Sequence, residues 1–190
     1  GIDNARVVLN AAEMPILDGS AKPYVDAIRR AGIKKQEAPR QVFEIIKPVE
    51  VSDGDKYVRL EPYHAPYFLF SIDFESAAIG RQDLEYVHED MDRFAREIAP
   101  ARSFAQARDV LAAQAAGMAL GATMEGGILV DGDTVKNPEG LRFDDEFVRH
   151  KILDAMGDMS LAGGTVRGKF ISHKGGHTLT NRALHALFSD

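Results

Sequence analysis

The chain has 190 residues, of which 45% are hydrophobic and 27% are charged, a composition typical of a globular protein with a substantial core. Its formal net charge of −6 excludes generic nucleic-acid binding, which needs a basic face, and no apolar run approaches the ~18 residues of a membrane-spanning helix. It contains no cysteine, so any metal site must use His, Asp or Glu. We expect a cytoplasmic protein without a membrane span or a signal peptide.

The first forty residues predict a strand, a turn, a helix and a linker. Residues 5–10 have the pattern of a short strand, and Asp18-Gly19 marks a turn after which Ser20 can cap a helix. Apolar residues then recur at helical spacing, at Tyr24, Val25, Ile28 and Ile33. Gly32 is expected to end this helix. The polar residues 35–40 read as a linker.

From residue 41 the pattern changes to strands. Strands are predicted at 42–46, 49–51 and 57–60, and the turn at 52–55 joins the last two as a hairpin. A further, nearly continuous apolar strand covers 67–74. Further elements alternate: a helix ending at Pro100, a brief strand at 101–104, a helix at 106–116, strands at 128–130 and 166–171, and a helix at 178–188. Strands mixed with helices and joined by hairpins predict an α+β fold of two layers, sheet and helix.

The central stretch of the chain is a predicted helix within residues 143–158. Its polar side carries His150, Asp154 and Asp158, which are spaced by four and therefore lie in one row. His-x-x-x-Asp is a workable pair of metal ligands, because the spacing directs both side chains at one point. An exposed polar face of an ordinary amphipathic helix is the alternative. The opposite arc is apolar and consists of Val148, Ile152, Leu153, Ala155, Met156 and Met159.

Five segments, in order along the chain, carry a family resemblance. They are Glu-Met-Pro-Ile-Leu-Asp-Gly-Ser (13–20), Ser-Ile-Asp-Phe (71–74), Ala-Arg-Ser-Phe (101–104), the block Asn-Pro-Glu-Gly-Leu-Arg-Phe-Asp-Asp-Glu-Phe-Val-Arg-His-Lys-Ile-Leu-Asp-Ala-Met-Gly-Asp (137–158) and His-Lys-Gly-Gly-His (173–177). With them the chain resembles the zinc-dependent UDP-3-O-acyl-N-acetylglucosamine deacetylases of lipid A biosynthesis in Gram-negative bacteria. That activity is the hydrolysis of an N-acetyl group with release of acetate.

The resemblance implies a domain organisation. The family has two similar α+β domains that pack helix face to helix face around a cleft. Residues 1–34 resemble the tail of the first domain, 35–40 the linker and 41–190 the second domain. Residues 105–130 would be the insert that forms a tunnel for the acyl chain. We expect the apolar surface left without a first domain to bind the missing segment or to self-associate.

The resemblance also implies roles for the site residues. His150 and Asp154 match two protein ligands of a Zn²⁺ ion that keeps a position open for water and lowers its pKa towards ~7. His177 matches the histidine that stabilises the oxyanion and protonates the leaving amine, with Asp158 as the carboxylate that orients it. Ser103 stands where the family has a threonine that hydrogen-bonds the intermediate. The expected substrate contacts are Lys151, Lys174, Asp73, Phe74 and Phe104, with Lys56 near the rim of the cleft.

Two features depart from the family pattern. The third zinc ligand, a histidine, and the glutamate that serves as general base match positions just before residues 1–4, so we expect this chain alone to be weakly active or inactive. Ala105-Gln106 replaces a glycine and an aromatic residue at the tunnel mouth. Two alternatives remain open: a non-catalytic fragment that binds a UDP-sugar, and a structural metal site on a helix face in a domain of unrelated function.

Overall fold

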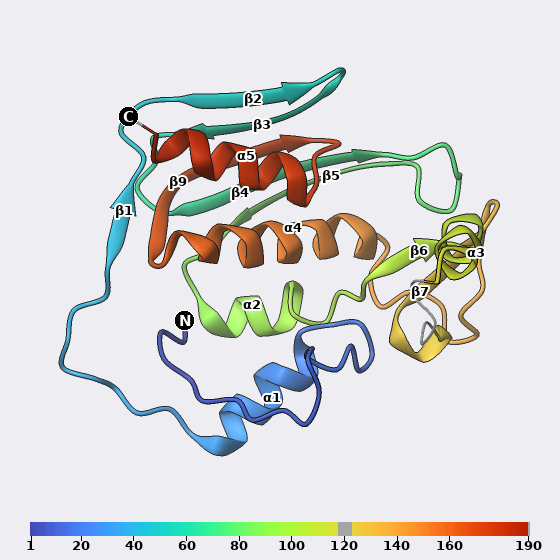
Figure 1. Cartoon of the computed structure of the whole chain (residues 1–190), viewed down its shortest axis with the longest axis horizontal. Helices are drawn as coiled ribbons and strands as arrows, with labels where there is room; N and C mark the ends of the chain where they lie inside the picture. The colour runs from blue at the N-terminus through green and yellow to red at the C-terminus, as the bar shows by residue number, and fades with distance from the viewer. Residues whose placement is uncertain (118–122, 190) are drawn as a thin grey trace.

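The computed structural model describes residues 1–117 and 123–189, and its largest element is a mixed sheet (Figure 1). The strand order is β2 (Val49–Asp53), β3 (Lys56–Glu61), β9 (Thr165–His173), β4 (Pro66–Asp73) and β5 (Arg81–Val87). The short β1 (Val42–Glu44) pairs with the beginning of β9 in parallel. The hairpin predicted around residues 52–55 is confirmed as β2–β3, and Gly54 provides the positive φ of 60° that its turn requires.

Strand β9 lies in the middle of this sheet. It is antiparallel to β3 and parallel to β4, so the last strand of the chain is inserted between strands that are close in sequence. Buried and more exposed residues alternate along β9, as expected of a strand with one face on the core. The carboxyl ends of β4 and β9 lie side by side, since Ser71 pairs with His173. This places the chain that follows each strand at one end of the sheet.

Two helices form the second layer. Helix α4 (Glu146–Met159) packs against β4 and β5, and helix α5 (His177–Leu187) packs against β2 and β3 (Figure 1). The two helices also contact each other. The predicted α+β fold with one sheet layer and one helix layer is therefore confirmed. The apolar arc predicted for α4 faces the sheet, because Val148, Ile152, Ala155 and Met159 are buried.

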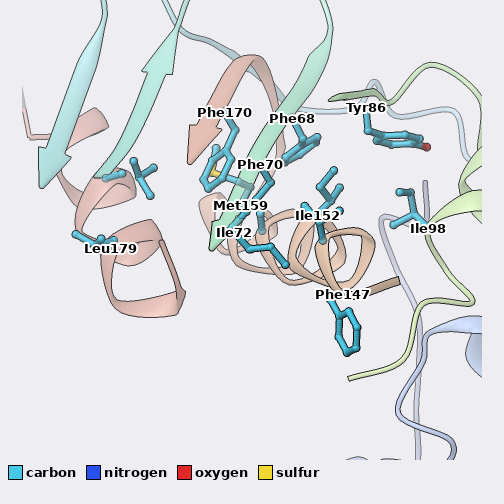
Figure 2. Packing of buried hydrophobic residues seen from close by; sticks show 14 of the residues in the cluster. Phe68, Phe70, Ile72, Tyr86, Ile98, Phe147, Ile152, Met159, Phe170 and Leu179 are labelled. Atoms are coloured by element: carbon cyan, nitrogen blue, oxygen red, sulfur yellow. The ribbon is translucent and has the colours of Figure 1, made fainter. Parts of the chain in front are cut away.

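The core lies between these layers. Figure 2 shows Phe68, Phe70 and Phe170 of the sheet close to Ile152 and Met159 of α4. All five side chains are at most 7% exposed. Burying one such side chain stabilises a fold by about 1.5–3 kcal/mol, so this interface holds α4 against the sheet and leaves its polar row on the other side of the helix.

A second, smaller sheet lies beyond the amino-terminal end of α4 (Figure 1). It consists of β6 (Phe104–Gln106), β7 (Ile128–Asp131) and β8 (Thr134–Val135). Strands β6 and β7 are parallel and α3 (Ala107–Ala115) follows β6, so the described part of the predicted insert is a βαβ unit. Residues 118–122 of that insert lie outside the described residues. The remaining helices of the described chain are α1 (Lys22–Ala31), α2 (Met91–Glu97) and the short η1 (Met124–Gly126) and η2 (Ser160–Ala162).

The amino-terminal region differs from the prediction in one element. Helix α1 forms and ends at Gly32, but residues 5–10 form no strand. A strand needs a partner for its backbone N–H and C=O groups, and no strand of the described structure pairs with this segment. Residues 35–40 contain no helix or strand, and the chain runs past them in extended form to β1 (Figure 1). Within the described ranges, every helix is too short or too polar to cross a membrane.

Candidate active site

His150 and Asp154 lie on the side of α4 that faces the small sheet. Their spacing of four residues brings His150 Nε2 to 3.3 Å from Asp154 Oδ1. Both side chains are mostly enclosed, at 11% and 22% exposed. The row predicted from the sequence therefore exists, and it is not the freely solvated face of an ordinary surface helix.

The other ring nitrogen of His150 has a backbone partner. His150 Nδ1 lies 3.0 Å from the carbonyl oxygen of Ala101. A carbonyl can only accept, so Nδ1 must carry a proton to make this bond, and Nε2 is the nitrogen directed at Asp154. The hydrogen bond thereby fixes the orientation of the ring.

Asp154 is also held by a neighbouring lysine, since Lys151 Nζ lies 2.7 Å from its Oδ2. Burial raises the pKa of the Asp154 carboxyl, but hydrogen bonding and charge from His150, followed by those of Lys151, outweigh it and lower the pKa to about 2. Asp154 is therefore a carboxylate throughout the physiological range. One of its oxygens faces His150 and the other faces Lys151.

His177 and Asp158 form a second pair one turn further along α4. His177 Nδ1 lies 2.9 Å from Asp158 Oδ2 and 3.0 Å from Oδ1, across the contact between α4 and α5. The carboxylate accepts a hydrogen bond from the Nδ1–H group, which leaves Nε2 as the nitrogen that can exchange a proton with solvent or substrate. His177 is 67% exposed and Asp158 only 20%, so the ring is accessible while its partner is largely covered.

The loop between β9 and α5 carries Lys174 in a left-handed conformation, with φ of 52°. Such a conformation is unusual for a residue other than glycine and marks a constrained position. The backbone N–H of Lys174 donates to Ser71 O, and its Nζ lies 3.1 Å from both Asp55 Oδ2 and Asp73 Oδ2. The hydrogen bonds with Asp55 and Asp73 raise the pKa of Lys174, so the group remains a cation.

Ser103 and Phe104 enter the site where β6 begins. The Ser103 N–H donates to Gly19 O, and Ser103 O accepts from the Ile128 N–H, each at 2.7 Å. The Phe104 ring packs edge-on against the Phe74 ring, with centroids 5.7 Å apart. The backbone around Ser103 is thus fixed from both sides.

A cleft of about 490 Å³ gathers these residues. Its walls include every site residue predicted from the sequence except Asp158, which lies against His177; the lining set is Ser103, His177, Lys151, Lys174, Asp73, Phe74, Phe104, His150 and Asp154, with Lys56. Asp109 also lines the cleft and was missed. In sequence it resembles any acidic residue in the first turn of a helix, a position that the helix dipole favours without a functional role.

The donor set of His150 and Asp154 suits a zinc ion. Nitrogen and oxygen ligands of tetrahedral zinc lie about 2.0–2.2 Å from the metal, which separates two donor atoms by about 3.4 Å. His150 Nε2 and Asp154 Oδ1 are 3.3 Å apart, and the Ala101 carbonyl fixes the ring as an outer partner of a metal-bound histidine does. Within residues 1–117 and 123–189, no group of three or more His, Cys, Asp or Glu residues is arranged to hold a metal.

Comparison with known proteins gives a consistent result over the chain. The family model of the UDP-3-O-acyl N-acetylglycosamine deacetylases (LpxC) matches residues 1–189. Proteins named UDP-3-O-acyl-N-acetylglucosamine deacetylase from Shewanella sp. (strain W3-18-1), Shewanella violacea and Campylobacter jejuni are each 44% identical over all 190 residues. The chain spans 62% of the two Shewanella proteins and 64% of the Campylobacter protein, less than two thirds of each.

Proposed function

Because the chain belongs to the UDP-3-O-acyl N-acetylglycosamine deacetylase family, we propose that it contributes to the zinc-dependent hydrolysis of the N-acetyl group of UDP-3-O-acyl-N-acetylglucosamine. The products are acetate and a free amine. The observation that carries this proposal is the meeting of two His–Asp pairs, His150–Asp154 and His177–Asp158, beside one cleft. The proposal includes a role in lipid A biosynthesis of a Gram-negative cell and a cytoplasmic location.

His150 and Asp154 hold the zinc ion in this proposal. The Ala101 carbonyl keeps His150 Nε2 directed at the metal, and Lys151 occupies the second oxygen of Asp154. When bound, zinc supplies Lewis acidity: it polarises a carbonyl group and lowers the pKa of water.

In this proposal His177 protonates the leaving amine. Asp158 accepts from its Nδ1, so Nε2 can give a proton to the amine that leaves when the amide bond breaks. Exposure on the cleft side lets the ring reach the substrate. The Ser103 hydroxyl, on a backbone fixed from both sides, donates to the oxyanion that develops on the amide carbonyl.

Lys174, Lys151 and Lys56 are the cations that line the cleft, and two of them are engaged with carboxylates, Lys174 with Asp55 and Asp73 and Lys151 with Asp154. In this proposal their ammonium groups contact the diphosphate of the substrate, with Lys174 nearest to it. Phe74 and Phe104 provide aromatic surface for the base and the sugar. Asp73 is engaged with Lys174, so a nucleotide that bonds to Asp73 has to share or displace that ion pair.

We further propose that the remaining zinc ligand and the general base come from outside residues 1–190. His150 and Asp154 alone make a weak catalytic zinc site, and general acid–base catalysis contributes about 10²–10⁴-fold. Acetate release by this chain with added zinc should therefore be slight. It should rise when the portion of the relatives that precedes the matched region is supplied, either as an extension or as a separate chain. Full activity of the chain alone would refute this account of the base.

The zinc content of the purified chain tests the metal site directly. We expect about one zinc ion per chain after equilibration and its loss in His150→Ala. His185→Ala, which removes an exposed histidine from α5, is the matched control and should retain the metal. Absence of zinc from the unaltered chain would refute metal binding by His150 and Asp154 alone.

A second candidate function is that of a UDP-sugar-binding fragment without catalysis. It is favoured by the absence of a third metal ligand among the described residues. Calorimetric titration with UDP distinguishes the two, when combined with the acetate assay. Binding that depends on Phe74 and Lys174, without acetate release even in the extended chain with zinc, would support the fragment over the enzyme.

A further inference from the structure

We propose that Arg102 and Glu146 are positioning residues: their buried ion pair sets the register between residues 101–104 and helix α4, and so aims His150 Nε2 at Asp154. The significance of this aim for metal binding rests on the proposed function. The register itself is a property of the fold and can be tested without a metal.

The ion pair is enclosed and extensively hydrogen-bonded. Arg102 is 3% exposed and Glu146 is fully buried. Arg102 donates to Glu146 Oε1 from Nε at 2.9 Å and from its backbone N–H at 3.0 Å, and to Oε2 from Nη2 at 3.2 Å. The Arg142 N–H also donates to Oε2, at 2.6 Å. The remaining guanidinium bonds reach Glu139 Oε1 and Gly140 O, both at 2.6 Å.

Stability alone does not account for this pair. Moving two charges out of water is costly, and apolar residues of similar volume often stabilise a protein as well or better. What an ion pair of this kind adds is geometry, because the planar fork of Arg102 meets the carboxylate of Glu146 in one orientation only. A sliding or rotated segment 101–104 would leave both charges buried without partners. The pair therefore penalises every register except the one observed.

The pair lies one helical turn from His150. Glu146 and His150 are four residues apart on α4 and so project from the same face, while their partners Arg102 and Ala101 are neighbours in sequence. The two contacts act as successive links between the same segment and the same helix. The first link is the ion pair, and the second is the bond between Ala101 O and His150 Nδ1 at 3.0 Å. Holding the first in register places the Ala101 carbonyl at the ring nitrogen.

The position of segment 101–104 is also fixed by contacts with the small sheet. Ser103 follows Arg102 directly, and its backbone bonds to Gly19 and Ile128 continue the segment into the small sheet. Gly19 is closely packed there, since a Cβ at that position would lie 2.5 Å from Gly126 O. Segment 101–104 is therefore fixed at Ser103 by backbone contacts and at Arg102 by the ion pair, and His150 is aligned to this segment.

The test removes the planar guanidinium group of Arg102 and measures the Nδ1–H signal of His150. The double variant Arg102→Met/Glu146→Leu deletes both charges, and Arg102→Lys keeps the charge but not the planar fork. In the unaltered chain labelled with ¹⁵N-histidine, we expect a His150 Nδ1–H signal that is protected from exchange with water. In both variants this signal should disappear or exchange at least ~10-fold faster. Zinc affinity, measured by competition with a chromophoric chelator, should fall about 10–100-fold, as is typical when an outer partner of a ligand is lost.

A matched control comes from helix α2. Arg93→Met/Glu97→Leu removes the same two charges from an ion pair of 3.0 Å whose side chains form no hydrogen bond or ion pair with residues 101–104 in the described structure, and it should change neither readout. Circular dichroism establishes which variants fold; if the double variant does not, Arg102→Lys decides. Any folded variant without the fork that keeps the protected Nδ1–H signal overturns the proposal. If the unaltered chain binds no zinc, the proposed metal site fails, while the Nδ1–H signal still decides the positioning role.

Discussion

The two ends of helix α4 are built in opposite ways. At its amino-terminal end Glu146 is completely buried and accepts four hydrogen bonds from Arg102 and Arg142. At its carboxy-terminal end Asp158 has the imidazole of His177 as its partner, and that ring is 67% exposed. His150 and Asp154 lie between these ends and have intermediate exposure.

The difference matches two chemical requirements. A pair of metal ligands must stay in place before the metal arrives, since disorder in a ligand weakens binding. A group that delivers a proton must instead reach the substrate and exchange with water. On this argument the enclosed end of α4 supplies rigidity to His150, and the open end leaves His177 accessible.

The largest effect should follow a change at the enclosed end. Glu146→Ala leaves the Arg102 guanidinium buried without its carboxylate, and we expect a loss of about 3–5 kcal/mol in the free energy of unfolding. Asp145→Ala is the control, because Asp145 pairs with Arg149 at the same helix end but is partly exposed, and should cost about 1 kcal/mol or less. Urea denaturation measures both. Equal losses in the two variants would remove the basis of the contrast.

A change at the open end should separate stability from activity. His177→Ala removes one partner of an exposed pair, so its cost in stability should be no more than about 1 kcal/mol. In the extended chain proposed above, acetate release should fall about 10²–10⁴-fold, the usual contribution of general acid–base catalysis. His185→Ala, on the same helix, should leave both unchanged. A large loss of stability in His177→Ala would mean that this end is as structural as the other.

The elements that the sequence predicted are those whose signal is local. Helix α4, the β2–β3 hairpin and β4 each have a periodic apolar pattern, and all formed within a few residues of the predicted bounds. Strand β5 was missed because most of its residues are polar, as suits an edge strand. Residues 5–10 were assigned to a strand on apolar pattern alone, but a strand is made by its neighbour, and pattern does not show whether one is present.

The site residues also divide into those with a local sequence signal and those without one. The His150–Asp154 pair follows from helical spacing, and its cleft neighbours followed from the family resemblance. The Arg102–Glu146 pair was not predicted, because its members are 44 residues apart and nothing in either local sequence indicates the other. Arg102 alone reads as a surface residue, and Glu146 alone reads as an acidic residue at a helix start. Long-range polar pairs of this kind become visible only in the folded chain.

Burial of the Tyr86 hydroxyl, away from α4, should make the free energy of unfolding depend on pH. Tyr86 of β5 is 1% exposed, and burial raises the pKa of its hydroxyl to about 12. The unfolded chain releases this proton near pH 10, so the full stability is present below pH 10 and is lost as pH rises towards 12, by at most about 3 kcal/mol. Tyr86→Phe should flatten this decline in urea unfolding series between pH 8 and 11.5. Parallel declines in the two proteins would contradict the assignment.

The smallest effect concerns the end of β9, next to the loop that leads to the open end of α4. Ser172 is 1% exposed, and its Oγ has no hydrogen-bond partner among the described residues. A buried hydroxyl without a partner costs free energy, so Ser172→Ala should raise the free energy of unfolding by about 0.5–1 kcal/mol. Ser76→Ala is the matched control: Ser76 is 7% exposed and donates to Gly132 O, so its loss should lower stability by about 1 kcal/mol.

The changes in the free energy of unfolding expected for Ser172→Ala and Ser76→Ala have opposite signs. This difference tests how well polar groups are paired near the open end of α4. Ser172 lies near the end of β9 and packs against Gly175 of the following loop, where a Cβ would collide with the Ser172 hydroxyl; that loop positions Lys174 and His177. A gain in stability on removing the hydroxyl would mean that the end of β9, against which this loop packs, holds an uncompensated polar group, unlike the fully paired Arg102 and Glu146. A loss in Ser172→Ala as large as in Ser76→Ala would instead mean that the Ser172 hydroxyl is paired in solution. Both ends of α4 would then be equally satisfied, and only the exposure of His177 would distinguish them.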